Sequence, residues 1–254
     1  MTFRLIESDP VENSYQKMAM DEAILQAVSK GKVKPTLRFY RWSKPAVAIG
    51  YFQSVEEEVD REKCREDGVE IFRRMTGGGA VYKDPTGELN YSVIVPEELS
   101  GMPSDIEESY RKISECIIRA LEKIGIEADH SGINDVVVEG RKISGNAQTR
   151  KRGVLLQHGT LLLDFEPEKM VRYLKISEEK SKDKIASGLE GRVTTLKERR
   201  PGLTREEVEK VLKEGFSEEL SQEIEKGELT DWEKEKAREL YREKYSTEEW
   251  NFMR

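Results

Sequence analysis

Three consecutive glycines, Gly77–Gly79, lie between two stretches that have the composition of β-strands, and this arrangement constrains the fold more than any other feature. A glycine run has no side chains above its backbone N–H groups, so an anion can approach the main chain closely. Arg73 and Arg74 precede the run, and a guanidinium can bind a phosphate or carboxylate through two parallel hydrogen bonds. The spacing matches neither a P-loop nor a dinucleotide-binding loop. Two interpretations are about equally favoured: an anion-binding loop, or a tight turn flanked by surface arginines.

The composition excludes several classes of site. The chain has 254 residues, two cysteines and two histidines, so we expect no disulfide framework, no zinc site and no Ser-His-Asp protease triad. A net charge of −7 argues against a nucleic-acid-binding surface over much of the protein. No apolar segment is long enough for a signal peptide or a membrane span. We expect a single soluble, cytoplasmic domain over residues 1–254.

Hydrophobic periodicity predicts an α+β fold, with mixed or antiparallel β-sheets, packed helices and a helical C-terminal region. The expected strands are residues 3–6, 36–41, 46–52, 69–72, 80–82, 89–95, 135–138, 142–148 and 154–164. The expected amphipathic helices are residues 13–29, 55–67 and 104–125, the last beginning with a capping box of Ser104 and Glu107. From about residue 166 onward the pattern is helical and highly charged, with further capping boxes at 204–207 and 230–233.

A second cluster of polar residues occupies residues 134–148, Asn-Asp-Val-Val-Val-Glu-Gly-Arg-Lys-Ile-Ser-Gly-Asn-Ala-Gln. Lys142 begins an expected strand whose other members are small, which leaves room for a ligand. Taken alone, a solvated lysine at a hairpin tip is favoured over a ligand-binding one by roughly two to one. In combination with the glycine loop, Lys142 indicates a shared anion site.

The ordered motifs RRMTGGGAVYKD, NDVVVEGRKISGNAQ and QHGTLLLD resemble those of the lipoate-protein ligase A family, which has the biotin and lipoate ligase fold. MAMDEAI near the start and GRVTTL and EEWNF near the end also match, so the resemblance covers nearly the whole chain. It implies an enzyme that activates lipoate with ATP and Mg²⁺ to lipoyl-AMP. The lipoyl group then goes to a lysine of lipoyl-domain proteins, such as the E2 subunits of 2-oxoacid dehydrogenases and the glycine cleavage H protein.

The resemblance implies functional residues in this sequence at the positions that match the family's motifs. Lys142 matches the central lysine of the family and is the candidate catalytic residue. The candidate ATP- and lipoyl-AMP-binding residues are Arg73, Arg74, Gly77, Gly78, Gly79, Ala80, Val81, Tyr82, Asn134, Asp135, Lys142, Gly145 and Ala147. His158 is the candidate in the lipoyl pocket, and Asp135 is the candidate Mg²⁺ ligand.

The residues themselves agree with this chemistry. Forming an acyl-adenylate brings a carboxylate against a phosphate, and fixed cations and N–H dipoles must balance the charge that accumulates. Lys142 and the glycine loop supply both. The apolar runs Ala46–Ile49 and Val154–Leu163 can form the walls of a slot for the lipoyl chain, although most of these side chains are expected to be ordinary core, by about three to one.

Three positions leave alternatives open. Lys83 stands where many relatives have histidine, so no role is assigned to it. Asp135 is about equally a ligand of Mg²⁺ or ribose and a cap of the following turn. His158 lies on an apolar strand, where a hydrogen-bonded core histidine is at least as favoured as a ligand contact.

Two rival functions fit the same motifs. Cofactor-independent octanoyltransferases share much of the pattern, including Asn146–Arg150, but use an acyl-accepting cysteine just before the valine-rich strand. This chain has His130-Ser131-Gly132-Ile133 there, and Cys116 is expected on the buried face of a helix, so a thioester route has no evident nucleophile. The second rival is a non-catalytic, lipoyl-binding regulatory relative, against which Lys142 and the two arginines argue.

The end of the chain bears on its partners. In many single-chain lipoate ligases a small accessory domain follows the segment that matches Glu249–Phe252, whereas only Met253 and Arg254 follow it here. We therefore expect a separate accessory protein to supply that domain. Closure over a bound substrate excludes water and completes the charge cradle, so this chain alone is expected to activate lipoate poorly.

Overall fold

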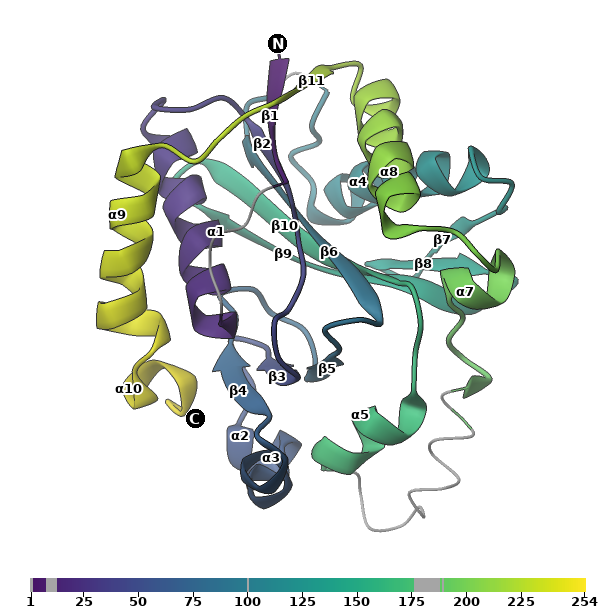
Figure 1. The fold of residues 1–254 in the computed structure, drawn as a ribbon. Helices are drawn as coiled ribbons and strands as arrows, with labels where there is room; N and C mark the ends of the chain where they lie inside the picture. The colour runs from purple at the N-terminus through teal and green to yellow at the C-terminus, as the bar shows by residue number, and fades with distance from the viewer. Residues whose placement is uncertain (1, 8–12, 100, 176–187, 189) are drawn as a thin grey trace.

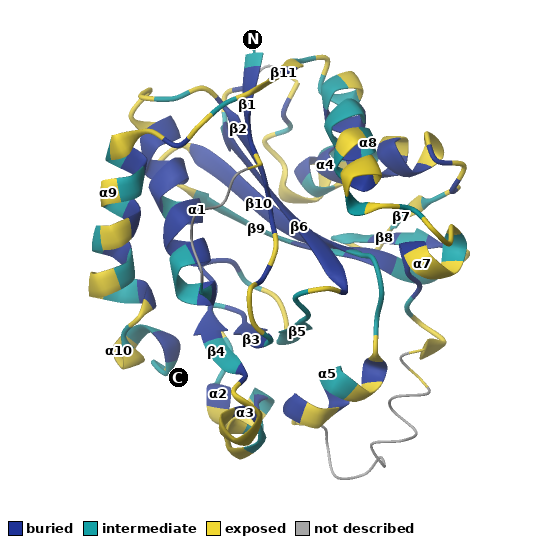
Figure 2. Cartoon of the chain, in the orientation of Figure 1, coloured by how far each residue is buried: buried dark blue, intermediate teal, exposed yellow. Residues whose placement is uncertain are grey.

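A computed structural model of the chain confirms the α+β fold. The structure describes residues 2–7, 13–99, 101–175, 188 and 190–254. Within these residues, an eight-stranded sheet runs through the middle of the molecule, and a three-stranded sheet lies at one end of it (Figure 1). Helices cover both faces of the large sheet, so its central strands are buried (Figure 2).

The large sheet has the strand order β11, β1, β2, β6, β10, β9, β8, β7. These strands are β11 (Glu223–Lys226), β1 (Thr2–Ile6), β2 (Thr36–Tyr40), β6 (Glu88–Pro96), β10 (Val154–Leu162), β9 (Arg141–Lys151), β8 (Asp135–Val138) and β7 (Asp129–Ser131). β1 pairs in parallel with β11 and β2, and the other neighbours pair antiparallel. β6 and β10 pair along their full length, which fixes the side chains that share a face.

Alternate residues of the central strands divide between two cores, one on each face of the large sheet. Tyr91 and Val93 of β6 pack with the helices of one face, whereas Ile94 packs with the helices of the other. This division follows from the two-residue period of a strand. The helices of the first face are α4 (Ile106–Glu122) and α8 (Arg205–Glu219), and those of the second are α1 (Ser14–Ser29), α9 (Asp231–Leu240), the π-helix η1 (Tyr241–Tyr245) and α10 (Glu248–Asn251).

The small sheet carries the glycine loop at its end. Its middle strand β3 (Ala46–Ile49) is buried along its whole length, as an unbroken apolar run predicts. β4 (Glu70–Arg73) pairs with it in parallel and β5 (Val81–Lys83) pairs antiparallel, so the loop joins β4 to β5. The remaining short helices are α2 (Val55–Glu58), α3 (Arg61–Asp67), α5 (Pro167–Tyr173) and α7 (Leu196–Arg199).

Two of the three predicted capping boxes are confirmed. Thr204 with Glu207 begins α8, and Thr230 with Glu233 begins α9. The prediction of Ser104 for α4 is wrong, because the side chain of Asp105 accepts the backbone N–H of Glu108. Aspartate and serine cap helices about equally well, so the sequence alone does not choose between neighbouring candidates.

The sequence pattern misses two strands and one helix break. β11 lies in the region that was expected to be helical, and β7 was not predicted. The expected helix over residues 55–67 is two helices, because Val59 has extended backbone angles and forms a bridge with Leu174. Part of the expected C-terminal helical region, residues 176–187 and 189, lies outside the described residues.

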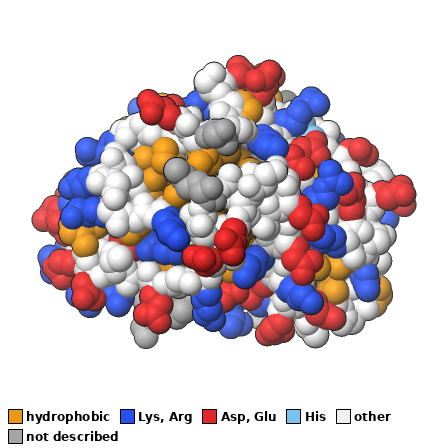
Figure 3. Space-filling view, turned by 90° about the horizontal axis from the view of Figure 1, so that it is seen from above, with side chains coloured by type: hydrophobic (Ala, Val, Ile, Leu, Met, Phe, Trp, Pro, Cys, Tyr) orange, Lys and Arg blue, Asp and Glu red, His pale blue; other side chains and the backbone are white. Residues whose placement is uncertain are grey.

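The surface carries charge of both signs. Over the face drawn in Figure 3, acidic and basic side chains are interspersed, with smaller hydrophobic patches between them. None of the helices in the described part of the chain has both the length and the apolar character of a membrane span.

Candidate functional site

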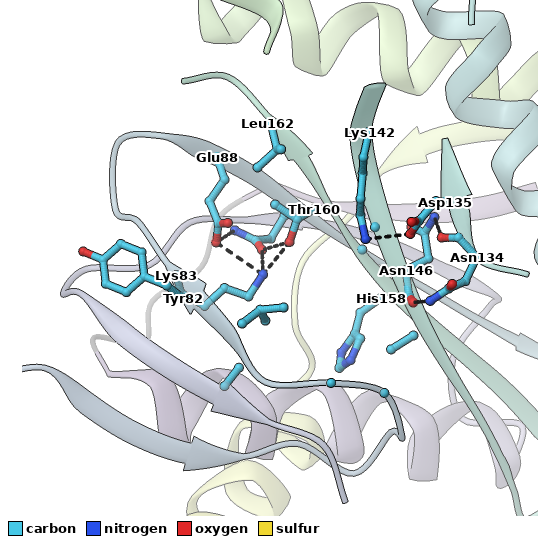
Figure 4. Close-up of a pocket in the computed structure, with 18 of the residues that line it drawn as sticks. Tyr82, Lys83, Glu88, Asn134, Asp135, Lys142, Asn146, His158, Thr160 and Leu162 are labelled. Atoms are coloured by element: carbon cyan, nitrogen blue, oxygen red, sulfur yellow. Dashed lines mark hydrogen bonds and ion pairs between the residues drawn. The ribbon is translucent and has the colours of Figure 1, made fainter. Parts of the chain in front are cut away.

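A pocket of about 570 Å³ lies between the large sheet, the small sheet and the glycine loop (Figure 4). This volume is typical of small-molecule sites. Most of the predicted site residues line it, and they come from three separate stretches of sequence: Arg74, Gly78, Gly79, Val81, Tyr82, Asn134, Asp135, Lys142, Gly145, Ala147 and His158. The predicted residues Arg73, Gly77 and Ala80 are not part of this lining.

Lys142 reaches into the pocket from β9 and pairs with Asp135 on the neighbouring strand β8 (Figure 4). The distance from Nζ to Oδ1 is 2.6 Å, and the two side chains are 38% and 33% exposed. An ion pair with this exposure adds little to the stability of the fold, so its main effect is to fix the position of the ammonium. The ammonium of Lys142 is therefore held at a defined place but stays within reach of a ligand.

The glycine loop folds around the guanidinium of Arg74, which donates hydrogen bonds to the carbonyl oxygens of Gly77, Gly79 and Ala48. Gly78 has a φ of +95°, and a Cβ there would lie 2.8 Å from Nη2 of Arg74, so only glycine fits. Burial lowers the pKa of Arg74 to about 10, and the group is therefore charged at neutral pH. Arg74 places a positive charge directly under the loop, although its N–H groups already have carbonyl partners.

Arg73 does not join Arg74 at the pocket, which corrects the expectation of an arginine pair around one anion. Successive residues of a strand point to opposite faces, so the two side chains separate. The backbone N–H of Arg73 donates to Oδ1 of Asn251 on α10. Its buried guanidinium donates to the carbonyl oxygens of Gly50, Tyr51, Gln53, Trp250 and Asn251. Arg73 holds the C-terminal helix against the small sheet.

His158 connects the pocket wall to the residue that precedes the glycine loop. Its Nε2 lies 2.8 Å from Oγ1 of Thr76, and its Nδ1 lies 3.4 Å from Oδ2 of the buried Asp21. Burial lowers the pKa of His158 despite the nearby carboxylate of Asp21, so the imidazole is neutral at pH 7. His158 is hydrogen-bonded like a core histidine and also lines the pocket, so the two sequence interpretations are compatible.

A buried polar cluster around Lys83 forms another part of the wall (Figure 4). Its Nζ lies 2.5 Å from Oγ1 of Thr160, and 3.5 Å from both Oδ1 of Asn90 and Oε1 of Glu88. Burial lowers the pKa of Lys83 and raises that of Glu88. The sequence motifs do not predict this cluster, although polar residues at alternate positions of the apolar strand β6 are a signal for it.

Most side chains of the two apolar runs expected beside the pocket are ordinary core, which is the alternative that the sequence favoured. Of the run Ala46–Ile49 only Ala48 lines the pocket: Val47 and Ile49 lie on the opposite face of β3, and Ala46 is buried in the same core as Ala48. Of the run Val154–Leu163 the apolar side chain of Leu162 lines the pocket, and most of the remaining apolar lining comes from other elements: Met18, Tyr40, Trp42, Phe72, Val81, Val137, Phe165, Met170 and Val193. These side chains can enclose a hydrocarbon chain next to the polar groups.

Neither cysteine reaches the pocket, as the sequence indicated for Cys116. Cys116 is buried in α4, and burial raises its pKa well above the usual value. Cys64 is also buried, and burial raises its pKa to about 12. A thiol nucleophile must be accessible and readily ionised, and neither thiol is. Of the segment His130–Ile133 before the valine-rich strand, Ser131 lines the pocket.

The carboxylates of the pocket limit any metal site. Within the described ranges, no three His, Cys, Asp or Glu side chains are grouped so that they could hold a metal ion. Asp135 is paired with Lys142, and Glu88 lies beside Lys83. Mg²⁺ needs only one or two protein carboxylates when substrate phosphates supply the other ligands. Asp135 fits that limited role.

Comparison with known proteins identifies relatives along the whole chain. The family model described as "Lipoyl protein ligase A/B catalytic domain" matches residues 13–217. The octanoyltransferase LipM of Kyrpidia tusciae is 40% identical over 276 residues, which cover 100% of this chain and 99% of the relative. Seven further curated relatives with the same name are 34–38% identical.

Solved structures with the same fold are described as ligases. One is a bi-partite lipoate protein ligase from Thermoplasma acidophilum, described together with its E2 lipoyl domain. It has a TM-score of 0.89 and 36% identity, and the match covers 99% of this chain and 96% of that one. A lipoate-protein ligase A bound with ATP has a TM-score of 0.84 and 33% identity, with 99% of both chains covered.

Proposed function

Because the chain belongs to the lipoyl protein ligase A/B catalytic-domain family, we propose that it transfers a lipoyl or octanoyl group to a lysine of a lipoyl-domain protein. The observation that carries this proposal is Lys142, held by Asp135 at the side of a pocket with an apolar wall. The relative from Thermoplasma acidophilum, described with its E2 lipoyl domain, supports this class of acceptor. E2 subunits and the glycine cleavage H protein are the proposed partners.

Two versions of this function, an octanoyltransferase and an ATP-dependent ligase, differ in the acyl donor that they use. The names of the curated relatives support an octanoyltransferase better than the ATP-dependent ligase that the sequence predicted. The position of the thiols supports a donor that is bound without a covalent link, such as an acyl-adenylate, because neither cysteine lines the pocket. We propose the adenylate route on this geometric ground, with transfer from an octanoyl thioester as the second candidate.

Lys142 has the same task with either donor. The neutral amine of the acceptor lysine attacks the acyl carbon, a C–N bond forms, and the amine loses a proton. The bond that breaks joins the acyl carbon to the phosphate oxygen of AMP or to the sulfur of a thiol. The ammonium of Lys142 would stabilise the negative charge that develops on the carbonyl oxygen and the leaving group. In the ATP-dependent version, Asp135 together with the phosphates would hold Mg²⁺.

The experiment that tests this function is a donor panel with a lipoyl domain as acceptor. The purified chain is given lipoate with ATP and Mg²⁺, preformed lipoyl-AMP, or an octanoyl thioester of a carrier protein, and the intact mass of the domain is measured. Transfer from lipoyl-AMP is the expected result. Transfer from the thioester alone would select the octanoyltransferase version. No modification from any donor would refute both versions and favour a non-catalytic lipoyl-binding relative.

We further propose that a separate accessory subunit assists the activation of lipoate. Its support is the relative described as bi-partite, which this chain matches over nearly its full length. In the same panel, lipoate with ATP should give slow transfer and lipoyl-AMP should give fast transfer, since the second step uses residues of this chain. Equally fast transfer from both donors would refute the need for a second subunit.

Gly145→Ala tests the position of the Lys142 ammonium. A Cβ at this place would lie 2.5 Å from Cε and 2.6 Å from Nζ of Lys142. The end of the flexible Lys142 side chain moves more easily than a strand, so the ammonium should be displaced. Acyl transfer from lipoyl-AMP should then fall by about tenfold or more. The melting temperature should change by only about 2–4 °C. Normal transfer by this variant would show that Lys142 need not stand where the structure has it.

Replacing each cysteine with alanine tests the non-covalent route. Cys64→Ala and Cys116→Ala should both keep the rate of acyl transfer within about threefold of the original protein, because the route has no thioester on the enzyme. A lower melting temperature is expected, since both thiols are packed in cores. Loss of transfer in either variant, with the fold preserved in circular dichroism, would favour the octanoyltransferase route.

A further inference from the structure

Arg192 lines the same pocket and has no role in the function proposed above. Its carbonyl oxygen accepts a hydrogen bond of 2.7 Å from the backbone N–H of Lys142, and the N–H of Thr194 donates one of 2.8 Å to the carbonyl of Lys142. Val193 thus forms a parallel bridge with Lys142. The backbone of residues 192–194 is fastened to the residue that carries the candidate catalytic ammonium.

Further contacts fix this short segment. The guanidinium of Arg141 donates to the carbonyl oxygen of Val193 at 3.4 Å, and Nε of Arg199 donates to Oγ1 of Thr194 at 2.9 Å. Thr194 is buried, whereas Arg192 is exposed although it lines the pocket. Because Arg192 both lines the pocket and is exposed to solvent, it lies at the mouth of the pocket. The backbone of Arg192 is therefore held in place while its side chain stays accessible to a ligand.

The other cations of the pocket are already engaged. Arg74 donates to backbone carbonyl oxygens, Lys83 lies among Thr160, Asn90 and Glu88, and Lys142 is paired with Asp135. Among the residues that the structure describes, the side chain of Arg192 has no recorded hydrogen bond or carboxylate partner. Among the described cations that line the pocket, Arg192 is therefore the one best able to bind an anionic ligand.

We propose that Arg192 binds a phosphate group of the acyl donor at the mouth of the pocket. A guanidinium presents two parallel N–H groups, which match two oxygens of a phosphate. The phosphate belongs either to a nucleotide, as in ATP and acyl-AMP, or to the phosphodiester through which a carrier protein holds an acyl thioester. Bound there, it would place the acyl carbon beside Lys142, the neighbour of Arg192 in the backbone pairing. This inference rests on the proposed function and names the group of the donor that is recognised.

The experiment compares Arg192→Gln, Arg192→Lys and a control, Arg65→Gln, in the full chain. Arg65 is an exposed arginine of α3 that does not line the pocket. Calorimetry measures the Kd for AMP, for ATP, and for octanoyl-pantetheine with and without its 4′-phosphate. Arg192→Gln should raise the Kd for the phosphorylated ligands that the original protein binds by about tenfold to a hundredfold, and Arg192→Lys by less. Arg65→Gln should leave all of these Kd values unchanged.

The pattern of losses identifies the source of the phosphate. Weaker binding of AMP and ATP alone assigns a nucleotide, and weaker binding of the phosphorylated pantetheine alone assigns a carrier arm. An unchanged Kd in Arg192→Gln, an equal loss for unphosphorylated octanoyl-pantetheine, or no binding of any phosphorylated ligand by the original protein would overturn the inference. Arg192-dependent binding without acylation of a lipoyl domain would instead refute the proposed function and leave the inference standing.

Discussion

Lys142→Ala should lower the rate of acyl transfer from lipoyl-AMP by about a thousandfold, because a single fixed group at the developing negative charge contributes effects of this size. The melting temperature should hardly change, since the ion pair with Asp135 is partly exposed. Lys142→Arg should recover only part of the rate, because a planar guanidinium does not replace a compact ammonium. Single-turnover rates and thermal melting measure the two effects separately.

Lys112→Ala is a matched control for Lys142→Ala. Lys112 pairs with Glu219 at 2.7 Å, nearly the distance of the pair between Lys142 and Asp135, but it lies on α4 outside the pocket. Transfer by Lys112→Ala should therefore be normal. If Lys142→Ala kept more than about a tenth of the original rate, the role of Lys142 in stabilising the transition state would be wrong.

Asp21→Ala should lower the free energy of unfolding by about 3–5 kcal/mol, which is typical when one partner of a buried ion pair is removed. Asp21 lies 2.5 Å from the guanidinium of Arg38, and both side chains are almost fully buried. It also accepts hydrogen bonds from Ser92 and contacts His158. Urea unfolding measures the loss. The double variant Asp21→Leu with Arg38→Met should be less destabilised than Asp21→Ala, since no unpaired charge stays buried.

The same carboxylate makes stability depend on pH in a defined direction. Burial alone would raise the pKa of Asp21, but Arg38, His158 and Ser92 together hold it below its ordinary value of 3.8. A carboxyl whose pKa is lowered by folding stabilises the protein fully above its unfolded pKa, and this contribution is lost as the pH falls through the folded pKa. The unfolding free energy of the original protein should fall below about pH 4, and that of Asp21→Ala should fall less steeply. Parallel curves for the two proteins would contradict the assignment.

The parts of the site that the sequence predicts are those that depend on local chemistry. The glycine loop needs glycine because Gly78 has a positive φ beside the Arg74 guanidinium, and such a requirement is visible in the residue types. Lys142 and Asp135 lie on adjacent strands joined by a two-residue turn, and the sequence predicts this hairpin but not the ion pair. The family follows from the same motifs and is confirmed by the match to its model.

The parts that the sequence misses depend on residues far apart in the chain. Arg73 was expected at the ligand, but its partners on α10 are more than a hundred residues away, and no local pattern reveals them. Lys83 on β5 of the small sheet meets Thr160 on β10 of the large sheet, 77 positions further along the chain. β11 has mostly charged residues and a single buried one, Ile224, so its parallel pairing with β1 decides its conformation rather than its own propensity.

The sequence motifs also do not decide between the two acyl donors. The resemblance favoured an ATP-dependent ligase, whereas the curated relatives are named octanoyltransferases. The sequence shows that a cysteine is missing from one place and predicts that Cys116 is buried, but only the fold shows that Cys64 is also buried and that both thiols lie away from the pocket. The acyl donor must therefore be identified by measuring which donors the enzyme uses.

A single-turnover mass measurement tests the central claim most directly. The chain is mixed with lipoyl-AMP and a lipoyl domain, the reaction is quenched at intervals, and the intact masses of both proteins are recorded. We expect the lipoyl mass to appear on a lysine of the domain and at no time on the enzyme, and we expect Lys142→Ala to block its appearance. A lipoyl adduct on Cys64 or Cys116 that forms before the domain is modified, or a domain that stays unmodified with the original protein, would contradict it.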